Sequence, residues 1–212
     1  MIDTASNVST VFLIDDDVKV RTSLSRALIT RGFKVMTFEA AFDFLDVYDP
    51  SQPGCLVLDY GLPQMDGLKL QQVLAERQIS IPIIFISGHG GVPETVQAMK
   101  AGAVDFLEKP FRQGALVDCI NTAILADREK RAEDYHRNSA LQRFAKLTLR
   151  EREVANFMIA NPSSTASKEI GRELKISPRT VDHHRARILE KMEIGSVAEL
   201  IDLSIPHADR LD

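Results

Sequence analysis

Five polar side chains each stand at or just beyond the end of a short apolar run in the sequence: Asp15, Asp16, Asp59, Ser87 and Lys109. If these runs are parallel strands, their carboxyl ends share one edge of a sheet, and the side chains meet there. Carboxylates that close repel one another, and a hard divalent cation such as Mg²⁺ relieves the repulsion because it prefers oxygen ligands. Carboxylates, a hydroxyl group and an ammonium group together suit phosphoryl transfer.

Within this set, Asp59 is the predicted nucleophile, which would form an acyl phosphate. Mg²⁺ and Lys109 would neutralise the charge on the phosphoryl oxygens. Single residues of these types also have plainer interpretations, because Asp17 after a strand is typical of a helix cap and a lone lysine is typical of a solvated surface. We favour phosphoryl transfer because acid, acid, hydroxyl and amine follow four separate apolar runs.

The apolar runs alternate with helical patterns over the first half of the chain. Five runs have the length and composition of strands: residues 11–14, 33–38, 55–58, 81–86 and 104–107. Between them, apolar residues recur at helical spacing, as Val20, Leu24 and Leu28 do. The alternation predicts an α/β domain with a mostly parallel sheet that is covered on both faces. In a flavodoxin-like strand order the first and third strands are neighbours, so Asp15 would lie beside Asp59.

The second half of the chain has only helical patterns. Residues 126–146 are charged and contain no Pro or Gly, which indicates a helical linker. From Leu147 onwards four helices are predicted, the first with Thr148 and Glu151 as a capping box. The third helix would begin after Ser177, with Pro178 at its first position and an inward face that includes His184. This half is therefore predicted to be a small all-α domain.

Composition and charge support two domains with different tasks. The 212 residues carry a net charge of −4, which argues against non-specific polyanion binding by the whole chain. Residues 1–126 hold 10 Lys and Arg against 15 Asp and Glu, whereas residues 168–191 hold 7 basic and 4 acidic residues. Cys55 and Cys119 lie in separate apolar segments and are predicted to be buried thiols. With neither a signal peptide nor a membrane span expected, we predict a soluble cytoplasmic protein with no membrane partner.

Several short motifs resemble those of known proteins. The runs FLIDDD at residues 12–17, LVLD at 56–59 and FLEKPF at 106–111 resemble the receiver domain of bacterial response regulators, especially the FixJ branch. The runs LRERE at 149–153 and ISPRTV at 176–181 are similar to the LuxR/FixJ-type helix-turn-helix. The resemblance implies a flavodoxin-like (βα)5 receiver domain over residues 1–125, a helical linker over 126–146 and a four-helix DNA-binding domain over 147–212.

The resemblance also implies a role for each residue of the acidic site. Asp59 would accept phosphate from a sensor histidine kinase, while Asp15, Asp16 and Asp59, together with the backbone carbonyl of Gly61, would hold Mg²⁺. Ser87 would be the switch hydroxyl that moves to the phosphoryl group, Phe106 would turn inward with it, and Lys109 would contact the phosphoryl oxygens. Residues 92–111 would form the face through which the phosphorylated chain becomes a homodimer.

The third helix of the second half is the predicted reader of double-stranded promoter DNA. Its N-terminal outer residues would meet base edges in the major groove, and for this role we predict Asp182, His183 and Ala186. Basic residues in and around it would mostly hold phosphates, and Thr180 is included in the same surface. The predicted phosphate contacts are Arg179, Arg185, Arg187, Lys168 and Lys191. Acidic neighbours dilute this basic surface, so useful affinity would need two copies on two half-sites.

We therefore expect a two-component response regulator that phosphorylation of Asp59 switches by a population shift, with RNA polymerase as a further candidate partner. No enzymatic activity is expected beyond assistance to its own phosphorylation and dephosphorylation. Two alternatives stay open from the residues alone. One is a phosphatase or phosphotransferase with an Asp nucleophile, which turnover of small phosphate esters would reveal. The other is a protein-interaction adaptor, which salt-sensitive DNA binding would exclude.

Overall fold

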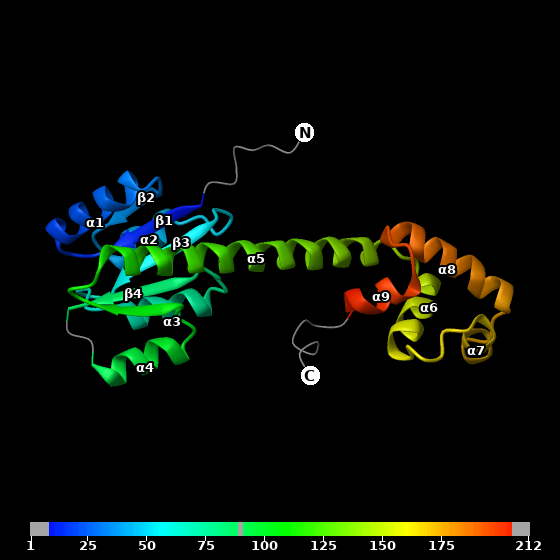
Figure 1. Ribbon diagram of the computed structural model, residues 1–212. Helices are drawn as coiled ribbons and strands as arrows, with labels where there is room; N and C mark the ends of the chain where they lie inside the picture. The colour runs from blue at the N-terminus through cyan, green and yellow to red at the C-terminus, as the bar shows by residue number, and fades with distance from the viewer. Residues whose placement is uncertain (1–8, 89–90, 205–212) are drawn as a thin grey trace. The chain divides into compact units, whose positions relative to one another are not determined.

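The computed structural model describes residues 9–88 and 91–204 (Figure 1). The chain divides into two compact units after Arg131. The first unit holds a five-stranded sheet, and the second contains helices.

All neighbouring strands of the sheet are parallel, and the strand order is β2-β1-β3-β4-β5. The strands are β1 (Thr10–Ile14), β2 (Lys34–Phe38), β3 (Gly54–Asp59), β4 (Ile83–Ser87) and β5 (Asp105–Glu108). Every residue of β1, β3 and β4 is buried, as expected for the central strands of a parallel sheet. This order is that of a flavodoxin-like fold, so the predicted fold class is confirmed.

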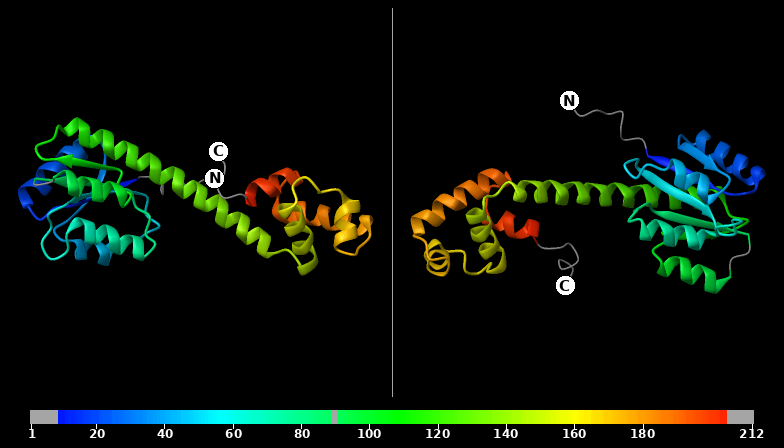
Figure 2. Two further views of the ribbon diagram at one scale, coloured as in Figure 1. Left: turned by 90° about the horizontal axis from the view of Figure 1, so that it is seen from below. Right: turned by 180° about the vertical axis from the view of Figure 1, so that it is seen from behind.

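Helices cover both faces of the sheet (Figures 1 and 2). On one face, alternate strand residues such as Phe12, Leu58 and Phe85 form a core with α2 (Ala41–Val47), α3 (Gly67–Glu76) and α4 (Val92–Lys100). On the other face, the intervening residues pack against α1 (Val18–Thr30) and α5 (Gln113–Ala145). The alternation follows from the two-residue period of a strand, and it leaves the carboxyl ends of the strands free for chemistry.

Helix α5 is one continuous helix of 33 residues that includes nearly all of the predicted linker. Its first turns pack on the sheet through Leu116, Ile120 and Ala123, which are fully buried or nearly so. The predicted start of the linker, residue 126, falls inside this helix. Asp127, one residue beyond the predicted boundary, is buried like the residues that pack on the sheet.

The second unit contains α6 (Leu149–Ala160), α7 (Ser167–Glu173), α8 (Pro178–Met192) and α9 (Val197–Ser204). The predicted capping box at the start of α6 is present, because the Thr148 hydroxyl accepts from the Glu151 N–H and the Glu151 carboxylate accepts from the Thr148 N–H. Ser177 caps α8 by accepting from the Thr180 N–H, again as predicted. These caps fix where the two helices begin.

Two smaller predictions concern the cysteines and the membrane. Cys55 and Cys119 are both buried free thiols, as predicted. Burial raises the pKa of each thiol to about 12, so neither is a reactive thiolate. Among the helices in the described ranges, none is both long enough and apolar enough to cross a bilayer.

Candidate functional site

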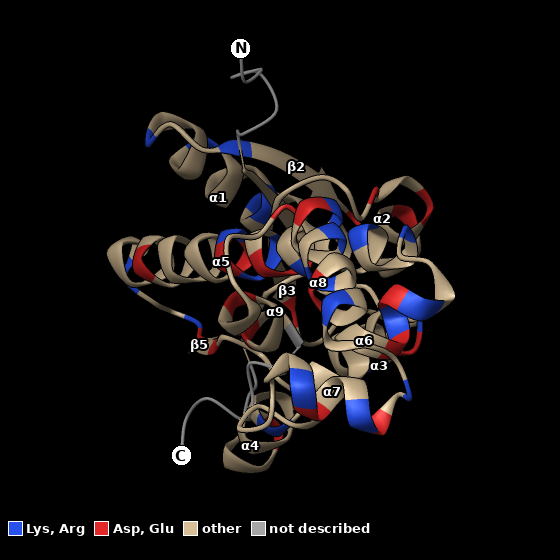
Figure 3. Ribbon diagram, turned by 90° about the vertical axis from the view of Figure 1, so that its right-hand side faces the viewer, with Lys and Arg blue, Asp and Glu red and all other residues tan. Residues whose placement is uncertain are grey.

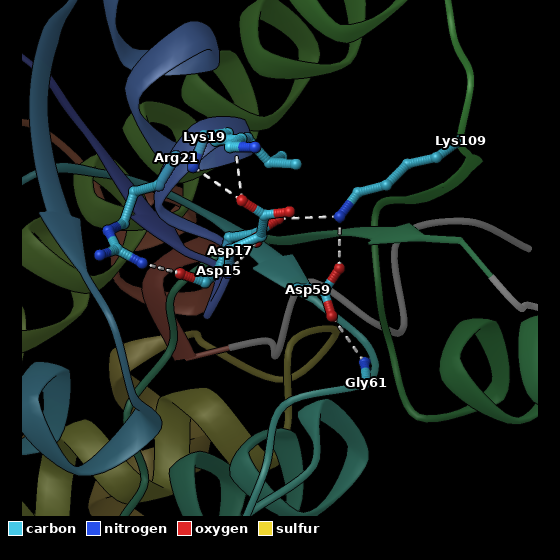
Figure 4. A network of polar contacts seen from close by, with 8 residues as sticks. Asp15, Asp17, Lys19, Arg21, Asp59, Gly61 and Lys109 are labelled. Atoms are coloured by element: carbon cyan, nitrogen blue, oxygen red, sulfur yellow. Dashed lines mark hydrogen bonds and ion pairs between the residues drawn. The ribbon is translucent and has the colours of Figure 1, made fainter.

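Asp15, Asp59 and Lys109 meet at the carboxyl ends of three strands (Figure 4). Ile14 and Leu58 are paired across β1 and β3, so the residues that follow them lie side by side. Lys109, just after β5, places its Nζ 2.8 Å from Asp15 Oδ2 and 2.6 Å from Asp59 Oδ1. The predicted convergence of acid and amine from separate strands is therefore present in the structure.

The three side chains are electrostatically coupled. Burial raises the pKa of Asp15, partly offset by its bond to Lys109. Burial alone would lower the pKa of Lys109, but its bonds to Asp15 and Asp59 outweigh burial and raise it. Lys109 therefore stays cationic at neutral pH, where it compensates the two buried carboxylates. The same positive charge suits the oxygens of an incoming phosphoryl group.

The remaining oxygens of the site are held by backbone amides. Asp59 Oδ2 accepts from the Gly61 N–H at 2.8 Å, and Asp15 Oδ1 accepts from the Asp17 N–H at 2.9 Å. Asp17 itself caps α1 by accepting from the N–H groups of Lys19 and Val20, which is the plainer role considered for it. Asp59 Oδ1 accepts from Lys109 Nζ, so each oxygen of this carboxylate is held by a donor.

The predicted Mg²⁺ set was Asp15, Asp16, Asp59 and the backbone carbonyl of Gly61. Asp15 and Asp59 supply hard oxygen donors side by side, and this donor chemistry fits Mg²⁺. Asp16 is exposed, and in the described ranges no three His, Cys, Asp or Glu side chains are gathered to hold a metal ion. The structure thus brings together two carboxylates and an amine, and the full metal set stays a prediction.

The predicted switch residues lie beside this pocket. Ser87, the last residue of β4, is 3% exposed, and its carbonyl accepts from the Lys109 N–H at 2.7 Å. Phe106 of β5 is half-buried, with its ring centroid 6.1 Å from those of both Tyr60 and Phe85. Tyr60, which directly follows the candidate nucleophile, therefore lies beside the predicted aromatic switch residue.

The predicted DNA-contact residues lie on α8 and in the first turn of α7. Those exposed to solvent are Arg179, Asp182, His183, Ala186, Arg187 and Lys168, whereas Thr180, Arg185 and Lys191 are half-buried. Figure 3 shows Lys and Arg interleaved with Asp and Glu along α7 and α8. His184 is half-buried and lies at helical spacing between the buried Val181 and Ile188, in agreement with the inward face predicted for α8.

Several of these side chains have partners within the protein. Lys191 Nζ lies 2.6 Å from Glu151 Oε2, and this contact helps to lower the pKa of Glu151 to about 2 although burial acts against it. Arg187 pairs with Glu190 at 2.8 Å on the exposed face of α8. Lys191 therefore links α8 to the capping box of α6, a role that its position in the sequence did not indicate.

A polar cluster at the opposite end of the sheet was also missed. Asp127 accepts from the Gly54 N–H at 2.9 Å, and Arg131 Nε lies 2.8 Å from Asp127 Oδ2. The Arg131 guanidinium also donates to the carbonyls of Pro50 and Gln52. The four-residue spacing of Asp127 and Arg131 on a helix was the available signal.

The fold and site define a receiver domain, followed by a helix-turn-helix domain. The family model "Response regulator receiver domain" matches residues 11–121, and "Bacterial regulatory proteins, luxR family" matches residues 145–204. The chain is 42% identical to the transcriptional regulatory protein TdiR of Thauera aromatica, with 92% of this chain and 85% of that protein covered. It is 40% identical to the transcriptional regulatory protein FixJ of Bradyrhizobium diazoefficiens, with coverage of 92% and 94%.

Solved structures agree with these sequence matches. A low-resolution structure of the response regulator StyR aligns with a TM-score of 0.80 at 42% identity and covers 92% of this chain and 97% of that one. Full-length FixJ from B. japonicum aligns with a TM-score of 0.56 at 38% identity, with coverage of 92% and 95%. The chain belongs to the FixJ/LuxR-type response regulators of two-component systems. Of the three classes considered from the sequence, these matches support the transcription regulator over the enzyme and the adaptor.

Proposed function

We propose that Asp59 accepts a phosphoryl group from the phosphohistidine of a sensor histidine kinase. Asp59 Oδ1 forms the new O–P bond while the P–N bond to the kinase histidine breaks, and the electron pair leaves with that imidazole. The observation that carries the proposal is the position of Lys109, whose Nζ lies 2.6 Å from Asp59 Oδ1 and so beside the phosphoryl group that would form there. Mg²⁺ held by Asp15, Asp16, Asp59 and the Gly61 carbonyl would supply further charge neutralisation.

The acyl phosphate then changes which conformation of the receiver is favoured. Ser87 and Lys109 bind the phosphoryl oxygens better in one state, and Phe106 turns inward as Ser87 moves. The affected surface is the predicted dimer face, residues 92–111. Support for this face comes from three apolar side chains of α4 that are exposed in the single chain: Val92 at 78%, Val96 at 44% and Met99 at 42%.

Dimerisation brings two copies of α8 to two half-sites of promoter DNA in the cytoplasm, where contact with RNA polymerase would follow. Because acidic residues interrupt the basic surface of α7 and α8, one copy binds weakly and the second contributes most of the useful affinity. Phosphorylation thereby controls transcription through the dimerisation equilibrium. The chain performs no chemistry on other substrates in this scheme, apart from assisting its own phosphorylation and dephosphorylation.

The test measures phosphoryl label on the chain, the mass of its oligomers and its affinity for DNA in the same preparation. The chain is incubated with Mg²⁺ and a small phosphodonor, or with BeF₃⁻, beside Asp59→Asn and the control Asp17→Asn, which alters only the cap of α1. We expect one phosphoryl group per chain, formation of dimers and tighter DNA binding in the wild type and in Asp17→Asn. Absence of label from the wild type, or equal labelling of Asp59→Asn, would refute the proposal.

A further inference from the structure

Two side chains of α8 form hydrogen bonds with the chain around the start of α7. Asp182 Oδ1 accepts from the Ser167 hydroxyl at 2.5 Å, and Ser167 is the first residue of α7. Arg185, one turn further along α8, donates from its Nη2 to the Thr165 carbonyl. The end of the connection between α6 and α7 and the first residue of α7 are therefore held against α8 at two points, Thr165 and Ser167.

Asp182 and Arg185 were both expected to contact DNA, but in the structure each forms a hydrogen bond to another residue of the protein. Arg185 is half-buried, and its Nε is buried without a hydrogen-bond partner, so the guanidinium points into the protein. Asp182 has one carboxylate oxygen committed to Ser167, and its negative charge would be unfavourable beside DNA phosphates. Asp182 is itself exposed, and so are His183 and Ala186, which lie one turn apart on the same helix.

We propose that Asp182 and Arg185 are positioning residues, and that His183 and Ala186 are the side chains that read bases. The proposal rests on the proposed DNA-binding function of α8. The imidazole of His183 presents an N–H donor, which suits the N7 and O6 acceptors of guanine in the major groove. The Ala186 methyl group suits the methyl group of thymine. Asp182 acts through Ser167, by fixing the start of α7 relative to the reading helix.

The salt dependence of DNA affinity distinguishes positioning residues from residues that contact phosphates. A lysine or arginine that binds a phosphate releases a counterion, so its removal reduces the slope of log K against log salt by roughly 1. Arg185→Met should weaken binding at every salt concentration without a change in this slope. Arg179→Met, which changes an exposed arginine of the same helix, should reduce the slope by roughly 1.

The main experiment measures base preference with the full chain activated by BeF₃⁻. A duplex is selected from a random pool by the wild type, and affinities are then measured for that duplex and for each single base-pair variant. We expect His183→Ala to lose roughly tenfold discrimination at one base pair, because a good contact to a base contributes about 1–3 kcal/mol. Asp182→Asn, which keeps an acceptor for Ser167, should leave the preferred base at every position unchanged.

Ser167→Ala tests the positioning role without a change of charge. We expect roughly fivefold weaker binding to all duplexes alike, the loss typical of one hydrogen bond, and faster hydrogen exchange of the amides of residues 165–170. A shift of base preference toward adenine in Asp182→Asn, or a reduced salt slope in Arg185→Met, would overturn the proposal. Failure of the wild type to select any duplex would instead refute the DNA-binding function, and the exchange measurement would still test the link between Ser167 and Asp182.

Discussion

Arg131 and Asp127 fasten α5 to the segment between α2 and β3, residues 48–53. The Asp127 side chain is 1% exposed and accepts from the Gly54 N–H and from Arg131 Nε. The Arg131 guanidinium also donates to the carbonyls of Pro50, Ser51 and Gln52 at 2.9 to 3.2 Å. We predict that Arg131→Met, which keeps the apolar stem and removes the donors, destabilises the first unit.

The size of the effect follows from what the substitution leaves behind. Asp127 would remain as a buried carboxylate with only the Gly54 N–H as partner, and three backbone carbonyls would lose their donor. Removal of one partner from a buried ion pair costs about 3–5 kcal/mol. The Arg131 side chain is 28% exposed, so water replaces part of what is lost, and we expect a loss of about 2–3 kcal/mol.

The assay is urea unfolding of the full chain, followed by circular dichroism. The matched control is Arg128→Met, because Arg128 is exposed on the same helix and its removal should change the free energy of unfolding by less than about 0.5 kcal/mol. A second variant tests the cause. Asp127→Asn combined with Arg131→Met removes the uncompensated charge, so the double variant should be more stable than Arg131→Met alone.

Two results would refute this reasoning. If Arg131→Met is no less stable than Arg128→Met, the cluster contributes nothing measurable to the fold. If the double variant is no more stable than Arg131→Met alone, the loss does not come from a buried, unpaired carboxylate. In that case the lost hydrogen bonds to the backbone carbonyls of residues 50–52 would be the remaining cause.

Three further predictions concern stability. Gly54→Ala should lower the free energy of unfolding in urea by more than about 3 kcal/mol, because a Cβ there would lie 1.9 Å from a backbone oxygen of β1. Gly114→Ala should raise it by about 0.5–1 kcal/mol, because a Cβ at this position of α5 would meet open space. The pKa of Asp15 is raised in the folded protein, so the free energy of unfolding should fall as pH rises from about 3.9, the pKa of an unfolded Asp, through the pKa of folded Asp15. Asp15→Asn should remove this fall when the free energy of unfolding is measured against pH. The pKa of Glu151 is lowered to about 2, so its contribution to the free energy of unfolding is present above about pH 4.3 and is lost as pH falls toward 2. Glu151→Gln should therefore weaken the loss of stability between about pH 4.3 and pH 2 and cost about 1 kcal/mol at neutral pH.

The sequence was sufficient to predict the central part of the acidic site. Short apolar runs that alternate with helical segments are typical of a parallel sheet, and the carboxyl ends of parallel strands share one edge. Residues directly after β1, β3 and β5 must then come close, and Asp15, Asp59 and Lys109 do. The same logic placed Ser87 at the end of β4.

Side-chain partners were harder to predict than positions. Asp15, Asp16 and Asp17 are consecutive, yet one is buried in the pocket, one is exposed and one caps α1. Which aspartate takes which role depends on the local turn of the backbone between β1 and α1, and composition alone does not encode this. For the same reason Arg185 was predicted to hold a DNA phosphate, whereas its Nη2 donates to the Thr165 carbonyl.

The Asp127–Arg131 cluster bears on the route that the proposed phosphorylation signal would take through the receiver. The first turns of α5 pack on the sheet through Leu116, Ile120 and Ala123, and the cluster then ties the helix to residues 50–54 at the amino ends of the strands. The acidic pocket lies at the opposite, carboxyl ends. A helix held along its packed length and again at Arg131 resists sliding over the sheet. We therefore expect the change at Phe106 to act through the α4 and β5 surface, residues 92–111, and not through a shift of α5 relative to the receiver.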